Sequence, residues 1–169
     1  MNKLELKEAF EKALKFEQNG YNIYSETAKK TQNPIVKKTF KYLADQELFH
    51  IDEIKGYIAA IDADIEFKGD DLEKTKEFFK TTTEEFKEKT ELSDDDIKAH
   101  EAGLHLEKSA YNFYKEQHDL IDNEEIKKFF KWLMEQESAH YNLIDKSYQF
   151  IKDPVGFYSE EERWSVDGG

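Results

Sequence analysis

The chain has 169 residues, enough for one domain with a sizeable core, and it contains no cysteine, which excludes disulfides, thiolate zinc sites, iron–sulfur clusters and cysteine nucleophiles. Its net charge of −13 makes nucleic acids and anionic lipid surfaces poor partners, because like charges repel. The longest apolar runs are too short to span a membrane, so we expect no membrane partner. The N-terminus lacks the apolar block of a signal peptide, and we therefore expect a cytoplasmic protein.

Signals for helices run along most of the chain, which has only two prolines and seven glycines. Asn33 followed by Pro34 is a typical helix start, since asparagine caps the first turn and proline suits the first helical position. Ser93 and Asn123 also precede acidic residues, which the positive end of a helix dipole favours. We predict four long helices, at residues 3–30, 34–62, 94–120 and 124–152.

The chain repeats itself after 90 residues. Residues 9–54 overlay 99–144 without a gap, and 18 of the 46 positions are identical, which indicates an internal duplication. Each copy is a helical hairpin, and two hairpins joined by a long crossover predict an all-α, ferritin-like four-helix bundle. The predicted domain, 1–152, consists of hairpin one at 3–62, a crossover at 63–92 that holds short helix, and hairpin two at 93–152, and a C-terminal tail follows at 153–169.

Each of the four predicted helices carries a glutamate on its apolar stripe. In the second helix, Glu47 and His50 lie at helical spacing among apolar residues, which places them on the face that packs against the core. The fourth helix repeats this Glu-x-x-His pattern, and the first and third helices each contribute one glutamate. The six side chains that the stripes direct into the core are Glu17, Glu47, His50, Glu107, Glu137 and His140.

Four glutamates buried together need compensation, because each ion loses solvation and like charges oppose one another's ionisation. No lysine shares these stripes. Two divalent cations would neutralise four carboxylates, and a neutral histidine adds a nitrogen ligand without changing that sum. This ligand pattern is typical of di-iron and di-manganese carboxylate bundles. We therefore predict two iron ions per chain, with manganese and zinc as alternatives that fit the same ligands, and we expect neither haem nor flavin.

Other polar residues near the stripes have weaker patterns. Four tyrosines lie one or two turns from a stripe glutamate, where a phenol could donate to a metal-bound carboxylate and fix its orientation, and aromatic packing is the alternative. These tyrosines are Tyr21, Tyr24, Tyr111 and Tyr114. Three histidines without a counterpart in the first copy are expected on the surface or in packing. One repeated pair of glutamates is expected to be exposed, and a contact with a metal-binding residue is the alternative. These residues are His100, His105, His118, Glu11 and Glu101.

Three segments carry a resemblance to a known family. Residues 44–50 (ADQELFH) resemble the second-helix motif of rubrerythrins, the non-haem di-iron peroxidases of the ferritin-like superfamily. Residues 106–114 (LEKSAYNFY) look like the third-helix motif of short, stand-alone rubrerythrin-like proteins, and the tail at 153–158 (DPVGFY) is similar to theirs. The resemblance covers residues 5–160. It implies that the six stripe residues bind two iron ions, that the protein reduces hydrogen peroxide to water, and that it forms a homodimer.

Two departures from the family pattern affect these expectations. Standard rubrerythrins carry a rubredoxin domain whose four cysteines hold an iron that supplies electrons, and this chain has no cysteine. Electrons must therefore come from an external donor, such as a rubredoxin. Rubrerythrins also have a second glutamate one turn along the third helix, where this chain has Ala110, and the first copy has Gly20 at the matching place. The predicted site is thus a symmetric set of six ligands.

The function that we expect is that of a di-iron oxidoreductase, with peroxide or oxygen as its small-molecule substrate. Three alternatives stay open at this point. One is a ferroxidase that handles iron as ferritins do, another is a scaffold that metal ions stabilise without catalysis, and the third is an oxygenase with an apolar substrate channel.

Overall fold

The structure, a computed structural model, describes residues 2–63 and 92–157. The described residues form four long helices and no strand, which confirms the all-α, ferritin-like bundle. The helices are α1 (Lys3–Lys30), α2 (Pro34–Ala63), α4 (Asp94–Leu120) and α5 (Glu124–Lys152). Of the predicted bounds, only the end of α2 differs, by one residue. The short helix expected in the crossover and the tail beyond residue 157 lie outside the described residues.

The predicted cap residues begin the helices. The side chain of Asn33 accepts hydrogen bonds from the backbone N–H groups of the second and third residues of α2, at 3.0 and 3.2 Å. Asn123 does the same at the start of α5, and Ser93 forms a reciprocal capping box with Asp96 at the start of α4. A further capping box begins α1 at Asn2. These bonds satisfy first-turn N–H groups that have no partner inside a helix.

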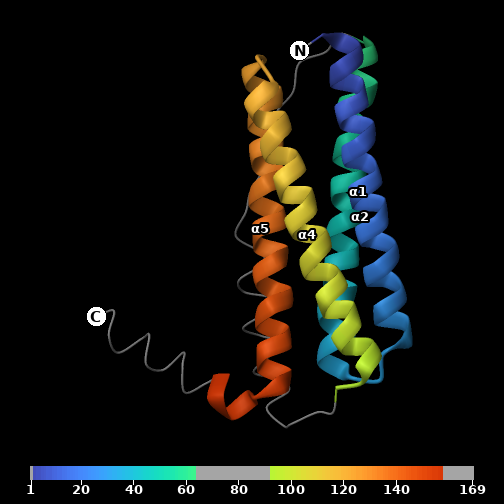
Figure 1. The fold of residues 1–169 in the computed structure, drawn as a ribbon. Coiled ribbons are helices and arrows are strands. Elements are labelled where there is room, and N and C mark those ends of the chain that lie inside the picture. Colours follow the sequence, from blue (N-terminus) through green and yellow to red (C-terminus); the bar gives the residue numbers. More distant parts are fainter. Residues whose placement is uncertain (1, 64–91, 158–169) are drawn as a thin grey trace.

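The four helices form two antiparallel hairpins that pack side by side (Figure 1). Short loops at 31–33 and 121–123 join α1 to α2 and α4 to α5, so the members of each hairpin run in opposite directions. Helix α1 also contacts α4, and α2 contacts α5, again in opposite directions. This arrangement turns the polar stripe of every helix toward the centre of one bundle.

Two apolar clusters fill the bundle, one toward each end. Tyr114, Phe130 and Leu133 belong to the cluster near the start of α1, and their counterparts in the first copy belong to the other cluster. The duplication therefore divides each matched pair between the two ends. The polar stripe residues lie between the clusters, where apolar side chains separate them from water at both ends of the bundle.

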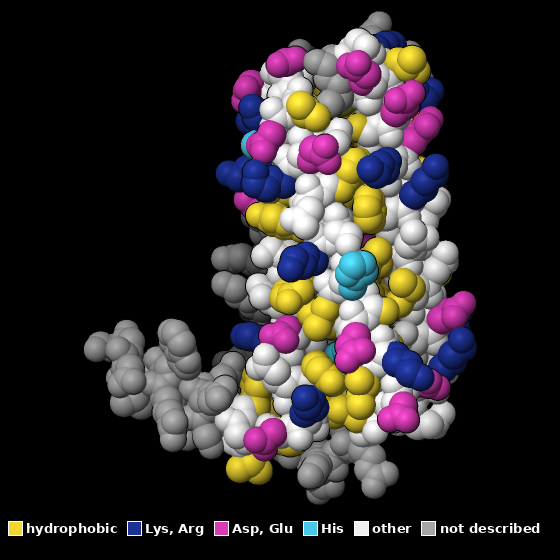
Figure 2. Space-filling model, viewed as in Figure 1, with side chains coloured by type: hydrophobic (Ala, Val, Ile, Leu, Met, Phe, Trp, Pro, Cys, Tyr) yellow, Lys and Arg dark blue, Asp and Glu magenta, His cyan; other side chains and the backbone are white. Residues whose placement is uncertain are grey.

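The surface is highly charged, and the described helices are not of the membrane-spanning kind. Figure 2 shows hydrophobic side chains down the middle of the face formed by α1 and α4, with acidic and basic side chains to both sides. Within 2–63 and 92–157, no helix has a stretch long and apolar enough to cross a bilayer.

His100, expected on the surface or in packing, is fully buried in α4. Its Nδ1–H donates to the carbonyl of Asp96 at 2.7 Å, and its Nε2 accepts from the Ser147 hydroxyl at 3.4 Å. The ring also packs against Phe40 and Tyr148. Burial lowers the pKa of His100 below its ordinary value of 6.5, and the hydrogen bond to Asp96 opposes this only in part. His100 is therefore a neutral packing residue.

We predict that His100→Gln reduces the loss of stability in mild acid. The pKa of His100 is lower in the folded protein than in the unfolded chain, so protonation favours unfolding. The contribution of His100 to the free energy of unfolding is complete above pH 6.5 and is lost as the pH falls below that value. Urea denaturation of the metal-free wild type and variant, at about pH 7.5 and about pH 5.5, measures the difference. An equal loss of unfolding free energy in both proteins would contradict the prediction.

Candidate metal centre

The bundle brings the six stripe residues together at its centre. Helices α1 and α4 each supply one glutamate, and α2 and α5 each supply a glutamate and a histidine one turn later. Every one of these side chains is at most 2% exposed. The structure therefore places Glu17, Glu47, His50, Glu107, Glu137 and His140 in one buried cluster. That they bind metal stays a prediction.

Three overlapping groups within this cluster could each hold a metal ion, since their ligand atoms lie within 4.8 Å of one another. The groups are Glu17 with His50 and Glu137; Glu47 with Glu107, Glu137 and His140; and Glu47 with His50 and His140. Glu47 and Glu137 each belong to two groups. These two carboxylates are thus the ones that neighbouring ions could share.

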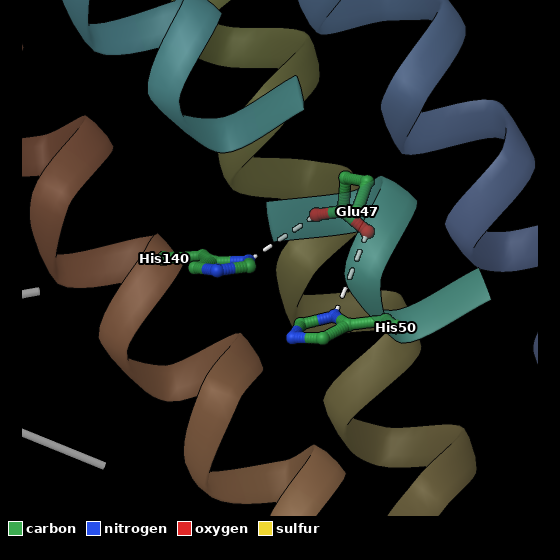
Figure 3. A group of neighbouring side chains, drawn as sticks. All are labelled: Glu47, His50 and His140. Carbon is green, nitrogen blue, oxygen red and sulfur yellow. Dashed lines mark ion pairs between the residues drawn. The ribbon is translucent and has the colours of Figure 1, made fainter. Parts of the chain in front are cut away.

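Glu47 lies between the two histidines (Figure 3). Its carboxylate oxygens are 3.9 Å from Nδ1 of His50 and 3.2 Å from Nδ1 of His140. Despite the shorter distance, His140 Nδ1 makes no hydrogen bond to any residue that the structure describes. Two ligand atoms at about 2.1 Å from one ion lie roughly 3 Å apart when they bind at right angles. The spacing therefore suits a shared cation better than a direct hydrogen bond.

Several polar atoms of the cluster are buried without a hydrogen-bond partner among the described residues. They are both ring nitrogens of His140, Nε2 of His50 and Oε1 of Glu137. Leaving such an atom unpaired in the core costs about 1–3 kcal/mol. A metal ion would give a partner to Nδ1 of His140, which faces Glu47, and to Oε1 of Glu137. The donor set of carboxylate oxygens and imidazole nitrogens suits iron, manganese or zinc.

The carboxyl groups cannot all ionise without a cation. Burial, reinforced by neighbouring carboxylates, raises the pKa of Glu47 and Glu137 well above the usual value, and burial raises the pKa of Glu107 to about 7. For Glu17, burial also raises the pKa, but the hydrogen bond from Glu47 and the charge of His50 outweigh it and lower the pKa to about 2. In the metal-free protein Glu47 and Glu137 thus hold protons, which metal binding must release.

His140 has the protonation state that metal binding requires. Burial, together with repulsion from His50, lowers the pKa of His140 to about 3. His140 is therefore neutral at physiological pH and keeps a nitrogen lone pair. Its ring stacks on that of His50, with centroids 5.3 Å apart and planes 14° from parallel.

Two of the four predicted tyrosines hydrogen-bond to cluster glutamates, and they do so across the hairpins. The Tyr24 hydroxyl donates to Glu107, and the Tyr114 hydroxyl donates to Glu17. Each tyrosine is seven residues, about 10 Å, beyond the glutamate of its own helix. Because α1 and α4 are antiparallel, it comes level with the glutamate of the other helix. Burial and then the charge of the accepting glutamate raise the pKa of both phenols, which keeps them protonated donors.

The remaining residues that the sequence singled out lie outside the cluster. Tyr21 and Tyr111 are half-buried and, within the described part of the chain, make no hydrogen bond to its carboxylates. Exposed positions hold His105, Glu11 and Glu101. His118 is half-buried, and its Nδ1 lies 3.1 Å from a carboxylate oxygen of Asp119.

Gly20 makes a contact with the cluster that the sequence did not predict. A Cβ atom at this position would lie 3.1 Å from the carboxyl carbon of Glu47 and 3.3 Å from its Cγ, closer than ordinary van der Waals contact. The missing side chain thus leaves room for Glu47 against α1. A glycine inside a helix is a signal that could have been noticed, but the sequence does not say which side chain occupies the room.

A crevice too narrow to hold a water molecule lies beside the carboxylates, between α1 and α4. Its lining consists of four matched pairs: Phe16 and Leu106, Glu17 and Glu107, Gly20 and Ala110, and Glu47 and Glu137. Neither cluster histidine lines it. The seam between α1 and α4 is therefore the side on which the carboxylates, and not the histidines, lie closest to the surface crevice.

Comparison with known proteins identifies a family over most of the chain. A family model described as Rubrerythrin matches residues 8–148, a range that includes all six cluster residues. No curated protein and no solved structure matches the chain. The likeness first seen in short motifs thus extends over both hairpins.

We predict that Gly20→Ala weakens metal binding, although alanine normally suits a helix better than glycine. The added methyl group must displace the Glu47 carboxyl group or the backbone of α1 by a few tenths of an ångström. Calorimetric titration with Fe(II) or Mn(II) measures the affinity.

Gly56→Ala in α2 is the matched control. A Cβ there meets nothing within 4 Å, so this substitution should raise the free energy of unfolding by about 0.5–1 kcal/mol and leave metal affinity unchanged. If both variants bind metal as tightly as the wild type, Gly20 does not position Glu47.

Proposed function

Since the chain belongs to the rubrerythrin family, we propose that it is a non-haem di-iron oxidoreductase that reduces hydrogen peroxide with electrons from an external donor. The observation that carries this proposal is the cluster of four glutamates and two histidines buried at the centre of the bundle. No lysine or arginine is among the buried residues of the described ranges. Metal cations are then the natural compensation for the carboxylates. The homodimer and the cytoplasmic location stay predictions.

The proposed ligands follow the overlapping groups of the cluster. For one ion they are Glu17 and His50, for the other Glu107 and His140, and for both ions Glu47 and Glu137. A bound ferrous pair supplies the two electrons that cleave an O–O bond. Manganese would fit the same ligands, whereas zinc has no redox chemistry and would make the site structural.

The chain's own side chains orient the site and hold its protons. Tyr24 and Tyr114 donate to Glu107 and Glu17, the two glutamates that are each proposed to bind one ion only. These hydrogen bonds fix the orientation of both carboxylates. Both phenols are fully buried and keep their protons. Glu47 and Glu137 release protons when metal binds, so metal binding strengthens as the pH rises.

The crevice beside the carboxylates favours a substrate of very few atoms. In this structure it is too narrow to hold a water molecule, whereas pockets that take drug-sized molecules have volumes of roughly 300–1,000 Å³. A site this closed gives no room to the organic substrate of an oxygenase, so peroxide or dioxygen is the better candidate. The family supports peroxide as the preferred oxidant.

We predict that the diferrous protein is oxidised several times faster by hydrogen peroxide than by oxygen, and that it consumes peroxide repeatedly only when a reductant is supplied. The second expectation follows from the chain itself, because without cysteine it has no rubredoxin-type iron to pass on electrons. Stopped-flow absorption with each oxidant, followed by peroxide assays with and without rubredoxin and its reductase, measures both.

Glu17→Ala and Glu11→Ala provide a matched pair on one helix for the same assays. Glu17 is buried in the cluster and Glu11 is exposed, so only the first substitution should abolish the reaction. Faster oxidation by oxygen, with many ferric ions retained per chain, would instead identify an iron-storage protein.

A further inference from the structure

A chain of aromatic rings leads from the surface to one histidine of the cluster. Phe49 on α2 is 49% exposed. Its ring centroid lies 6.1 Å from that of Trp132 on α5 and 6.3 Å from that of His50, and Trp132 lies 5.2 Å from His50. Aromatic rings with centroids about 4.5–7 Å apart are in contact. The path from solvent to His50 therefore crosses no gap.

The same path continues to the second histidine. His50 and His140 stack nearly parallel, with centroids 5.3 Å apart. Among the described residues, His50 is the aromatic ring that His140 contacts. Any route through rings to His140 thus passes through His50.

The path breaks the symmetry of the duplicated hairpins. The counterpart of Phe49 is Ala139, and the counterpart of Trp132 is Tyr42, so only the His50 side has this pair of rings. Trp132 also buries its indole Nε1–H without a hydrogen-bond partner in the described residues. Such burial costs about 1–3 kcal/mol. Phenylalanine would fill the position without that cost, so packing alone does not account for tryptophan here.

We propose that electrons from the external carrier reach the metal pair through Phe49, Trp132 and His50. The inference rests on the proposed function, and it adds the route by which the iron is reduced. Electron tunnelling weakens steeply with distance and most steeply across empty gaps, so touching rings give the strongest coupling. The rings themselves stay in one oxidation state. Each transfer oxidises the one-electron carrier protein and reduces one ferric ion to ferrous, and two transfers restore the pair. The two protons that peroxide reduction consumes come from water.

A competing aromatic path exists on the opposite side of the bundle. Phe16, half-buried on α1, contacts the ring of Tyr114, whose hydroxyl donates to Glu17. This path ends at a carboxylate through a hydrogen bond, and its inner ring is fully buried. It supplies the control for the experiment.

The test measures electron transfer into the iron-loaded protein from a fixed point. Because the chain has no cysteine, Lys128→Cys introduces a single thiol, at an exposed position one turn before Trp132 and nine residues before Glu137, the nearest cluster residue of α5. A ruthenium polypyridyl label on this thiol is reduced by a light flash in the presence of a sacrificial donor. The loss of ferric absorption then gives the rate of reduction of the metal pair. Trp132→Leu, Trp132→Phe and Phe16→Leu are compared at equal iron and helix content.

Trp132→Leu should slow the reduction severalfold, Trp132→Phe should slow it less because a ring remains, and Phe16→Leu should leave the rate unchanged. An unchanged rate in Trp132→Leu, or an equal slowing in Phe16→Leu, would overturn the route and leave the proposed function standing. Labelled protein that takes up no ferric iron would overturn both.

Discussion

Burying four carboxyl groups within a few ångströms of one another is the constraint on which the rest of this structure depends. In a bundle core, each ionised carboxylate loses its hydration and raises the free energy of its neighbours. Without a cation, the cluster responds by holding protons on Glu47 and Glu137, and by keeping His140 neutral. In the function that we propose, metal ions replace those protons, and the groups that oppose one another in the metal-free chain become ligands of the same ions. Metal binding and folding would then be coupled.

The duplication explains how a short chain surrounds such a cluster on all sides. Each hairpin supplies half of the cluster, and each supplies the tyrosine that donates a hydrogen bond to a glutamate of the other hairpin. Neither hairpin alone contains a glutamate together with the tyrosine that bonds to it. The two apolar clusters follow the same logic, since matched residues from the two copies fill opposite ends of the bundle. Departures from symmetry are therefore informative, and the clearest are Gly20 opposite Ala110 and Trp132 opposite Tyr42.

The fold and the composition of the cluster could be predicted from sequence because both depend on local spacing. Helical periodicity and the cap residues fixed the ends of the helices to within one residue. The duplication showed that Glu47 with His50, and Glu137 with His140, occupy equivalent places. Contacts between helices were not predictable in the same way, because they depend on the relative height and rotation of two helices. The sequence placed Tyr21 and Tyr24 one and two turns from Glu17 and could not tell which of them contacts the cluster, and only the antiparallel packing of α1 on α4 pairs Tyr24 with Glu107.

The metal content of the purified protein, measured together with its thermal stability, tests the coupling of metal binding and folding most directly. The buried charge predicts two metal ions per chain. It also predicts a melting temperature that falls on chelation and recovers with Fe(II) or Mn(II), by roughly 10 °C for each bound ion when the free metal is about a thousandfold above its dissociation constant. A protein that is fully folded without metal, and whose melting temperature does not respond to either ion, would show that the cluster is a set of protonated core residues and not a metal centre.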